Sequence, residues 1–525
     1  MALTIQGSNP WKAIGIGAKR SGHTASDDAF LWASRQLQEC ILQHDTCSKA
    51  TSGRLPTRLL DLAAFGSNQD VKLYESQSQT AQYICLSHCW GAYRPLKLEK
   101  ATLEVFKSRI PWTSLPLTFQ DAISFTRRLG MKYIWIDSLC IIQDDRDDWA
   151  RESANMAAIY HGSLLTLAAT RAESSSAGMF ARIPPEFKEH ELVSGTGLNG
   201  IPYSIFVRIA HGHQEGSIPT REHPLLTRAW VFQERLLSSR VLHFGHFEML
   251  WECAGATSCE CLRAKYIPEK LFINQTVAFK RTIERNFRVR AWHGIIQEYT
   301  KLNLSYHSDR LPALSGLAKA ITAQTGDQYL AGLWKSSFLS DISWKASYES
   351  FNIDKNKKNR RPAAWRAPSW SWVSVEAKIY FHENGAHPRE DPPEILEVHC
   401  VPSGLDPTGE LESGYILTSC HLLPATLQYN PQSSGEICYS LTMSPEGEPN
   451  DFAADYELSE PGETYVAHGD TIYMMYISTV MEAASDLNLV LRCVDTDLQK
   501  YERIGIGMFW EAESGRSPNT VITIV

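Results

Sequence analysis

The sequence predicts an α/β core that is followed by a helical segment and a β-rich C-terminal domain. Between about residues 81 and 180, strand-like and helix-like patterns alternate, an order typical of a parallel sheet with right-handed helical crossovers. From about residue 376 onward, alternating segments such as 415–419, 471–476 and 489–493 are separated by loops that carry Pro and Gly. The chain has 525 residues, so we expect two or three domains.

Each element of the core has its own signal in the sequence. Residues 133–136 alternate aromatic and β-branched side chains, which is typical of a strand. The helix that follows Pro116 has apolar residues at helical spacing, and Gly130 suits its C-terminal cap. The predicted strands are 83–87, 133–137 and 164–169, and the predicted helices are 117–129 and 149–160.

Four aspartates precede the second of these helices, and two interpretations of them are open. They either cap the free amides at the start of the helix and complement its dipole, or they bind a cation. Capping is the favoured interpretation. The four are Asp144, Asp145, Asp147 and Asp148.

We expect the chain to divide into four parts. The first contains an amphipathic helix at 28–44 that covers the core, and the second contains a polar, Pro-bearing insertion at about 181–224. After the insertion, Ala229 and Phe232 mark the apolar face of another helix, and two short strands follow it. The four parts are an N-terminal covering segment at 1–80, the core at 81–262, a helical and aromatic-rich segment at 263–375, and the β-rich domain at 376–525.

Composition and charge argue against several classes of function. The formal net charge is −8 and there is no long basic run, which argues against nucleic acid or an anionic membrane as the partner. No apolar run is long enough to span a bilayer. The twelve cysteines are scattered without regular spacing, which is typical of reduced thiols and not of a disulfide framework. We therefore expect a cytoplasmic protein whose partner is another protein or a small-molecule ligand.

The segment from Lys132 to Asp145 carries the richest polar chemistry of the chain. Its apolar run gives way to Asp137, Cys140 and Gln143, so an acid, a thiol and an amide follow the carboxyl end of a strand. Open α/β sheets bind their ligands at this edge. The sequence therefore predicts a functional site there.

Three blocks of the sequence stand out: YICLSHCWG (83–91), the segment from LPLTFQ to LTLAAT (115–170), and RAWVFQERLLSSRVLHF (228–244) with LWEC (250–253). Shorter segments accompany them, namely RLLDL, DRLPALSGLA, GLW, APSWSWVSV and YERIGIG. The three blocks resemble the signature blocks of the fungal heterokaryon-incompatibility (HET) domain. The shorter segments resemble the accessory segments of large HET proteins, so the resemblance covers most of the chain.

The resemblance implies a fungal protein that acts in non-self recognition leading to growth arrest or programmed cell death. It also implies that the core has a flavodoxin-like sheet of the kind found in Toll/interleukin-receptor domains. The alternative is a small-molecule enzyme on a HET scaffold, such as a cyclase or tailoring enzyme of fungal secondary-metabolite biosynthesis that holds a reactive conformer. This alternative is open because the sequence has neither a P-loop nor a sensor-like repeat beside the core.

One constellation would carry nucleophilic chemistry. Cys140 would be the nucleophile, His88 its base and Asp137 the orienting group. Cys140 lies in an apolar run, however, where a cysteine is usually a small buried side chain. A thiolate nucleophile is therefore disfavoured.

A second constellation is an electrostatic or general-acid site made by Asp137 and Glu234 beside Gln143 and Arg228. By analogy with enzymes of the Toll-like fold that cleave NAD with one glutamate, Glu234 is the catalytic candidate, and NAD cleavage is a less favoured function. The favoured structural alternative is that Arg228 and Glu234 pair across an interdomain seam. The remaining candidates for ligand contact are Trp90, Trp135, Trp230 and Gln233.

A zinc site is considered and disfavoured. The candidate ligands do not have the spacing of a standard finger or knuckle, and a strand at 240–244 would point His243 and Phe244 to opposite faces. We therefore expect no metal and no cofactor. The ligands considered are His243, His246, Cys253, Cys259 and Cys261.

Trp370 and Trp372 lie two residues apart, so on a strand they would share a face. They could line a ligand pocket, but packing between the core and the C-terminal domain is the favoured role.

Overall fold

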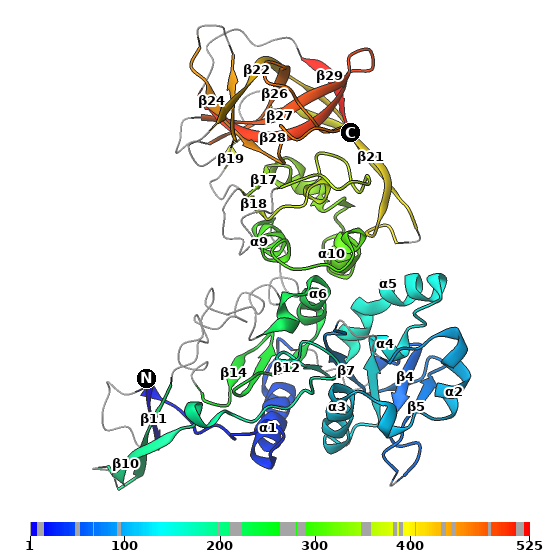
Figure 1. Cartoon of the computed structure of the whole chain (residues 1–525), viewed down its shortest axis with the longest axis vertical. Helices are drawn as coiled ribbons and strands as arrows, with labels where there is room; N and C mark the ends of the chain where they lie inside the picture. The colour runs from blue at the N-terminus through cyan, green and yellow to red at the C-terminus, as the bar shows by residue number, and fades with distance from the viewer. Residues whose placement is uncertain are drawn as a thin grey trace. The chain divides into compact units, whose positions relative to one another are not determined.

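The computed structural model places most of the chain, and the statements below concern the residues that it describes. They form two compact units, residues 1–287 and 288–525 (Figure 1). The finer division into four parts stays a prediction. The described residues are 2–7, 15–47, 53–66, 68–91, 96–197, 200–209, 223–262, 280, 289–347, 359–381, 386–387, 392–404, 406–431, 437–443, 447–480, 485–510 and 519–525.

The first unit is built on an eight-stranded mixed sheet. Its four central strands β12, β9, β7 and β8 are parallel, as the alternation of strands and helices predicts. Along the chain, β7 is followed by its neighbour β8 on one side, and the chain then crosses back to β9 and β12 on the other side of β7. The direction of the connections therefore reverses between β7 and β9. Antiparallel strands extend both edges. Across the sheet the order is β14 (Thr257–Cys259), β13 (Met249–Cys253), β12 (Arg240–Phe244), β9 (Leu165–Ala168), β7 (Ile84–Ser87), β8 (Tyr133–Ile136), β4 (Arg58–Asp61) and β5 (Lys72–Glu75).

Helices cover both faces of this sheet (Figure 1). On one face α1 packs against α3, where the rings of Phe30 and Phe125 meet edge to face with centroids 5.4 Å apart. On the other face α5 lies beside α6, and Tyr160 of α5 contacts Trp135 of β8. The helices are α1 (Asp27–Gln43), α2 (Leu103–Ser108), α3 (Leu117–Arg128), α4 (Asp137–Cys140), α5 (Arg146–Gly162) and α6 (Ala229–Leu237).

The described part of the polar insertion contains two strands that pair antiparallel. Its second strand pairs antiparallel with the first strand of the chain, from Ala2 opposite Arg208 to Gly7 opposite Tyr203. The sheet has the order β10 (His190–Thr196), β11 (Pro202–Arg208), β1 (Ala2–Gly7) and β2 (Gly15–Ile16), and a separate pair joins β3 (Gly53–Arg54) to β6 (Thr80–Ala81). The N-terminal segment therefore contributes strands as well as the predicted covering helix.

The second unit joins a helical part to the predicted β-rich domain. Its main sheet is antiparallel except where β28 pairs with β29. The helices are α9 (Val289–Tyr299), α10 (Pro312–Thr325) and α11 (Phe338–Asp341), and the two small sheets pair β15 (Tyr329–Leu330) with β16 (Leu333–Trp334) and β17 (Trp344–Ala346) with β18 (Ile379–Phe381). The main sheet runs β20 (Glu394–Pro402), β21 (Leu411–Cys420), β29 (Thr520–Ile524), β28 (Lys500–Trp510), β27 (Ser485–Asp495), β26 (Thr471–Val480), β22 (Leu422–Pro431), β23 (Ile437–Thr442) and β24 (Asn450–Asp451), with β19 (Ala386–His387) on β26 and β25 (Ala453–Ala454) on β28.

Buried tryptophans form the centre of the helical part. Trp370 and Trp372 lie in a turn and a 3-10 helix, not on a strand where they would share a face. Both rings are fully buried, as packing requires. The carbonyl of Gly332 accepts hydrogen bonds from the indoles of Trp292 (2.9 Å) and Trp372 (3.1 Å), which gives these buried donors a partner.

No helix in the described part of the chain is both long and apolar enough to cross a bilayer.

Candidate functional site

The carboxyl ends of β7 and β8 bring His88 and Asp137 together, because the two strands are parallel neighbours. Asp137 begins the short helix α4, and its carboxylate accepts a hydrogen bond from the amide of Ser138 (2.7 Å). The indole nitrogen of Trp90 donates to the other carboxylate oxygen (2.8 Å), and Nδ1 of His88 lies 3.6 Å from Asp137 Oδ1. Asp137 keeps 22% of its side chain exposed, whereas His88 keeps 1%. Asp137 is therefore the accessible member of the pair.

The loop after β7 needs a glycine to hold Trp90 in this position. Gly91 has a φ of +85°, and a Cβ placed on it would come within 2.4 Å of Cβ of Ser174. Ser175 then donates to the carbonyls of Cys89 (3.3 Å) and Trp90 (3.4 Å). The loop is thus packed against the segment that follows β9, at the place where the direction of the connections reverses.

Helix α6 adds Glu234 and Arg228 to the same edge. Arg228 precedes the helix, and its guanidinium donates to the carbonyl of His88 (2.7 Å). Glu234 is buried, and its Oε2 has no hydrogen-bond partner among the described residues. Burial raises the pKa of Glu234 to about 7, and the charge of Asp137 adds to this effect. We call Asp137, Glu234, His88, Trp90 and Arg228 the acid cluster.

His88 is a neutral group inside this cluster. Burial lowers the pKa of its imidazole to about 4, although the negative charge of Asp137 acts in the opposite direction. The ring packs edge to face on Phe119, with centroids 4.9 Å apart. Neither ring nitrogen has a hydrogen-bond partner among the described residues.

Comparison with protein families identifies the segment that contains the cluster. Residues 83–234 match the family model described as "Heterokaryon incompatibility protein (HET)". This segment is a HET domain. The match begins at the residue before β7 and ends at Glu234, so it contains all five residues of the acid cluster. No curated protein and no solved structure matches the chain, and the flavodoxin-like or Toll-receptor-like classification of the sheet stays a prediction.

Within the HET domain, Cys140 lies apart from this chemistry. Its side chain is fully buried on α4, and burial raises the pKa of its thiol to about 12. The described residues show no hydrogen bond between Cys140 and His88. The thiol is therefore protonated at neutral pH, which disfavours a nucleophilic role.

The remaining candidates from the sequence are Gln143, Trp135, Gln233 and Trp230. Gln143 donates from its amide nitrogen to the carbonyls of Asp137 (3.2 Å) and Ile141 (3.1 Å), so it fixes the backbone after β8. Trp135 is fully buried and Gln233 is nearly so, whereas Trp230 is half-buried.

Tyr160 was missed from the sequence because it counts as an apolar position of its helix. Its hydroxyl donates to the carbonyl of Leu86 (3.4 Å), and it opposes the rise in the pKa of Glu234. The helical spacing that assigns Tyr160 to the buried face is also the signal that could have placed its hydroxyl near the strand ends.

Two of the four aspartates have structural roles at the start of α5. Asp145 is the N-cap and accepts from the amides of Asp147 (3.1 Å) and Asp148 (3.3 Å), which confirms the capping interpretation for this residue. Asp148 is buried, forms an ion pair with Arg58 and accepts from the amide of Ile142 (2.9 Å).

The candidate zinc ligands from the sequence are not gathered at one point. His243 contacts Thr170 through Nδ1 (2.9 Å) and Glu252 through Nε2 (3.1 Å). Cys253 belongs to one group of possible ligands, and Cys259 and Cys261 belong to another. Among the described residues, His246 belongs to neither group.

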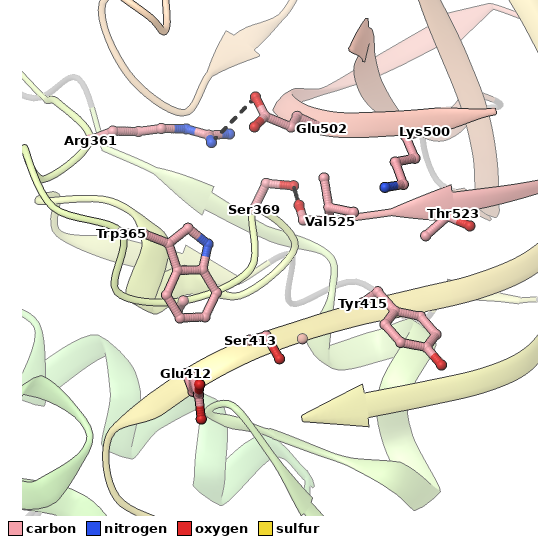
Figure 2. A pocket seen from close by; sticks show the side chains of 12 residues that line it. Arg361, Trp365, Ser369, Glu412, Ser413, Tyr415, Lys500, Glu502, Thr523 and Val525 are labelled. Atoms are coloured by element: carbon pink, nitrogen blue, oxygen red, sulfur yellow. Dashed lines mark hydrogen bonds and ion pairs between the residues drawn. The ribbon is translucent and has the colours of Figure 1, made fainter. Parts of the chain in front are cut away.

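The second unit has a hollow of about 670 Å³ that sequence reasoning did not indicate. Its lining mixes polar and apolar side chains, and Figure 2 shows Glu412, Ser413 and Tyr415 along β21 on one side of it. Across from them Arg361 forms an ion pair with Glu502 at 3.5 Å. Lys500 and Glu412 also line the hollow, so it carries charges of both signs.

Proposed function

We propose that this protein acts in fungal non-self recognition and that its HET domain triggers incompatibility cell death through the acid cluster. The observation that carries the proposal is that the matched span supplies every residue of the cluster. Two carboxyl groups in one buried edge, one of them half-protonated near neutral pH, are costly for stability. A costly arrangement at the carboxyl ends of parallel strands is typical of a functional site.

The cluster can bind a ligand that carries positive charge or an aromatic ring. Asp137 presents a partly exposed carboxylate, and Trp90 lies beside it as a flat apolar surface. Glu234 lies behind them and can exchange a proton at neutral pH, because its pKa is about 7. The carboxylate of Asp137 would thus attract the ligand, and Glu234 would exchange a proton.

Growth of a fungal host tests the proposal. We expect inducible expression of the wild-type chain to arrest growth, and the Glu234→Gln and Asp137→Asn variants to accumulate equally but to lose the arrest. The matched control is Glu104→Gln, because Glu104 is an exposed acid of α2 with 80% of its side chain accessible. Arrest by both cluster variants at wild-type strength would contradict the proposal.

The raised pKa of Glu234 favours a second candidate function, a small-molecule enzyme that cleaves NAD. NAD carries a cationic nicotinamide ring, which suits a carboxylate beside an indole. Nicotinamide release from NAD by the purified chain, and its loss in Glu234→Gln, would support this function. If a chain that arrests growth releases no nicotinamide, NAD cleavage is excluded, and the ligand-triggered and cyclase-like functions are the alternatives.

A further inference from the structure

We propose that Cys40, His44, Cys47 and Cys253 bind one zinc ion that joins the C-terminal end of α1 to β13. Their four potential ligand atoms all lie within 4.8 Å of one another. Three thiols and one imidazole are a ligand set of structural zinc sites. The proposal is independent of the acid cluster, since it involves none of its residues.

The distances fit tetrahedral coordination. Nδ1 of His44 lies 3.4 Å from Sγ of Cys253 and 3.9 Å from Sγ of Cys47. Zn–S bonds of about 2.3 Å and Zn–N bonds of about 2.0 Å in a tetrahedron place neighbouring ligand atoms about 3.5 to 3.8 Å apart. The four side chains therefore need only small adjustments to receive the ion.

The local sequence explains how three ligands converge. Cys40 lies in the last turn of α1, and His44, four residues later, is the C-cap residue of the helix. The helix ends at Gln43, and the amide of His44 donates to the carbonyl of Cys40 (3.3 Å). A turn in which the amide of Cys47 donates to the carbonyl of His44 (3.2 Å) then brings the third ligand back.

The fourth ligand comes from the end of β13, where the backbone comes close to His44. A Cβ on Gly255 would lie 2.6 Å from Cγ of His44, so this position requires glycine. The amide of Ala256 donates to Sγ of Cys253 (3.3 Å). Amide donors of this kind stabilise thiolates that are bound to a metal.

The charge around the group also suits a metal thiolate centre. Three thiolates and one Zn²⁺ leave a net charge of −1. Arg240 is almost fully buried, and its guanidinium donates to Sγ of Cys40 at 3.2 Å, so that a cation contacts this negative centre.

The site is structural because protein side chains provide all four ligands. Cys40, Cys47 and Cys253 are buried, and His44 is half-buried. A catalytic zinc site would keep one position open for water or substrate. The second group of possible ligands, Glu248 with Cys259 and Cys261, offers only three donors, so we expect one zinc per chain.

Elemental analysis of the full chain, purified without chelators, tests the proposal. We expect about one zinc per wild-type chain and less than about a tenth of this in Cys47→Ser and Cys253→Ser. The matched control is Cys493→Ser, which removes a half-buried thiol of the second unit and should keep the zinc.

Cobalt substitution keeps the test decisive if the cysteine variants fail to fold. Wild-type protein loaded with Co²⁺ should show the thiolate-to-metal charge-transfer band and the visible spectrum of a tetrahedral site. Wild-type chains without zinc and without this spectrum would overturn the proposal, as would mass spectrometry that finds a disulfide between two of the three cysteines.

Discussion

Replacement of Glu234 by Gln should change how the stability of the HET domain depends on pH. The substitution keeps the shape of the side chain but removes its titration. In the folded protein the pKa of Glu234 is raised from 4.5 to about 7 by burial, with Asp137 adding to the effect. At 1.36 kcal/mol for each pKa unit, this shift corresponds to about 3 kcal/mol of unfolding free energy.

The sign follows from which state binds the proton more tightly. The folded state holds the proton of Glu234 at pH values where the unfolded chain has lost it. The stabilisation is therefore complete below pH 4.5 and is lost as the pH rises to and through 7. The wild-type protein should lose about 3 kcal/mol over this window through Glu234, and the Gln variant should lose none of it.

His88 acts in the opposite direction, which is why a variant must be compared with wild type. Its pKa is lowered by burial from 6.5 to about 4, so its contribution is present above pH 6.5 and is lost as the pH falls through 4. In wild-type protein the two groups partly cancel each other. The difference between wild type and Glu234→Gln removes the contribution of His88, because both proteins retain it.

Native-state hydrogen exchange of the amides in β7 and β8 measures this difference within the intact chain. From pH 4.5 to pH 8, the unfolding free energy of the Gln variant should rise by about 3 kcal/mol relative to wild type. Glu104→Gln should show no such change, since Glu104 is exposed. A difference between Glu234→Gln and wild type that is constant over the whole pH range would refute the reasoning.

Three further substitutions test other parts of the structure. Cys140→Ala should leave growth arrest on expression unchanged, because the thiol is buried and protonated; loss of arrest at equal protein abundance would restore the nucleophile hypothesis. Asp455→Ala should lower the unfolding free energy of the second unit by about 3 to 5 kcal/mol, since it leaves the buried charge of Arg503 unpaired; an unchanged melting temperature would argue against this. Gly332→Ala should cost at least about 1 to 3 kcal/mol in thermal unfolding, because φ is +98° and the new Cβ would lie 2.5 Å from the indole nitrogen of Trp372, whereas Gly404→Ala, with open space around it, should be nearly neutral.

The central part of the fold was predictable because its elements are long or strongly patterned. Periodicity located α3 and α5, and the order of elements predicted parallel pairing of β7, β8 and β9. The antiparallel edge strands β4 and β5 were not predicted. Each has charged residues at both ends and only two apolar residues between them, so neither an apolar run nor an alternation stands out in the sequence.

The candidate site was predictable only where the topology determines neighbours. His88 and Asp137 follow two strands of one parallel sheet, so their proximity follows from the pairing of β7 with β8. Glu234 became the catalytic candidate by analogy with enzymes of the Toll-like fold, because sequence alone does not show which edge of the sheet α6 reaches. Its raised pKa depends on burial by many residues, which no local pattern encodes.

Only three of the four proposed zinc ligands could be grouped from the sequence. The spacing of Cys40, His44 and Cys47 is readable in the sequence as one turn of helix followed by a reverse turn. The fourth ligand, Cys253, lies on a distant strand that is brought near by the packing of α1 on β13. Sequence reasoning instead grouped Cys253 with its neighbours along the chain, because long-range proximity is set by the fold.

The geometry of the acid cluster links ligand binding to protonation. The charge of Asp137 contributes to the raised pKa of Glu234, and Asp137 is the more accessible of the two carboxylates. A cationic group bound at Asp137 would cancel part of that charge and lower the pKa of Glu234. Binding near neutral pH would therefore release a proton, and by linkage the affinity for a cationic ligand should rise with pH through the titration of Glu234. A neutral ligand held only by Trp90 would show no such dependence, so the pH profile of binding distinguishes the two classes of ligand.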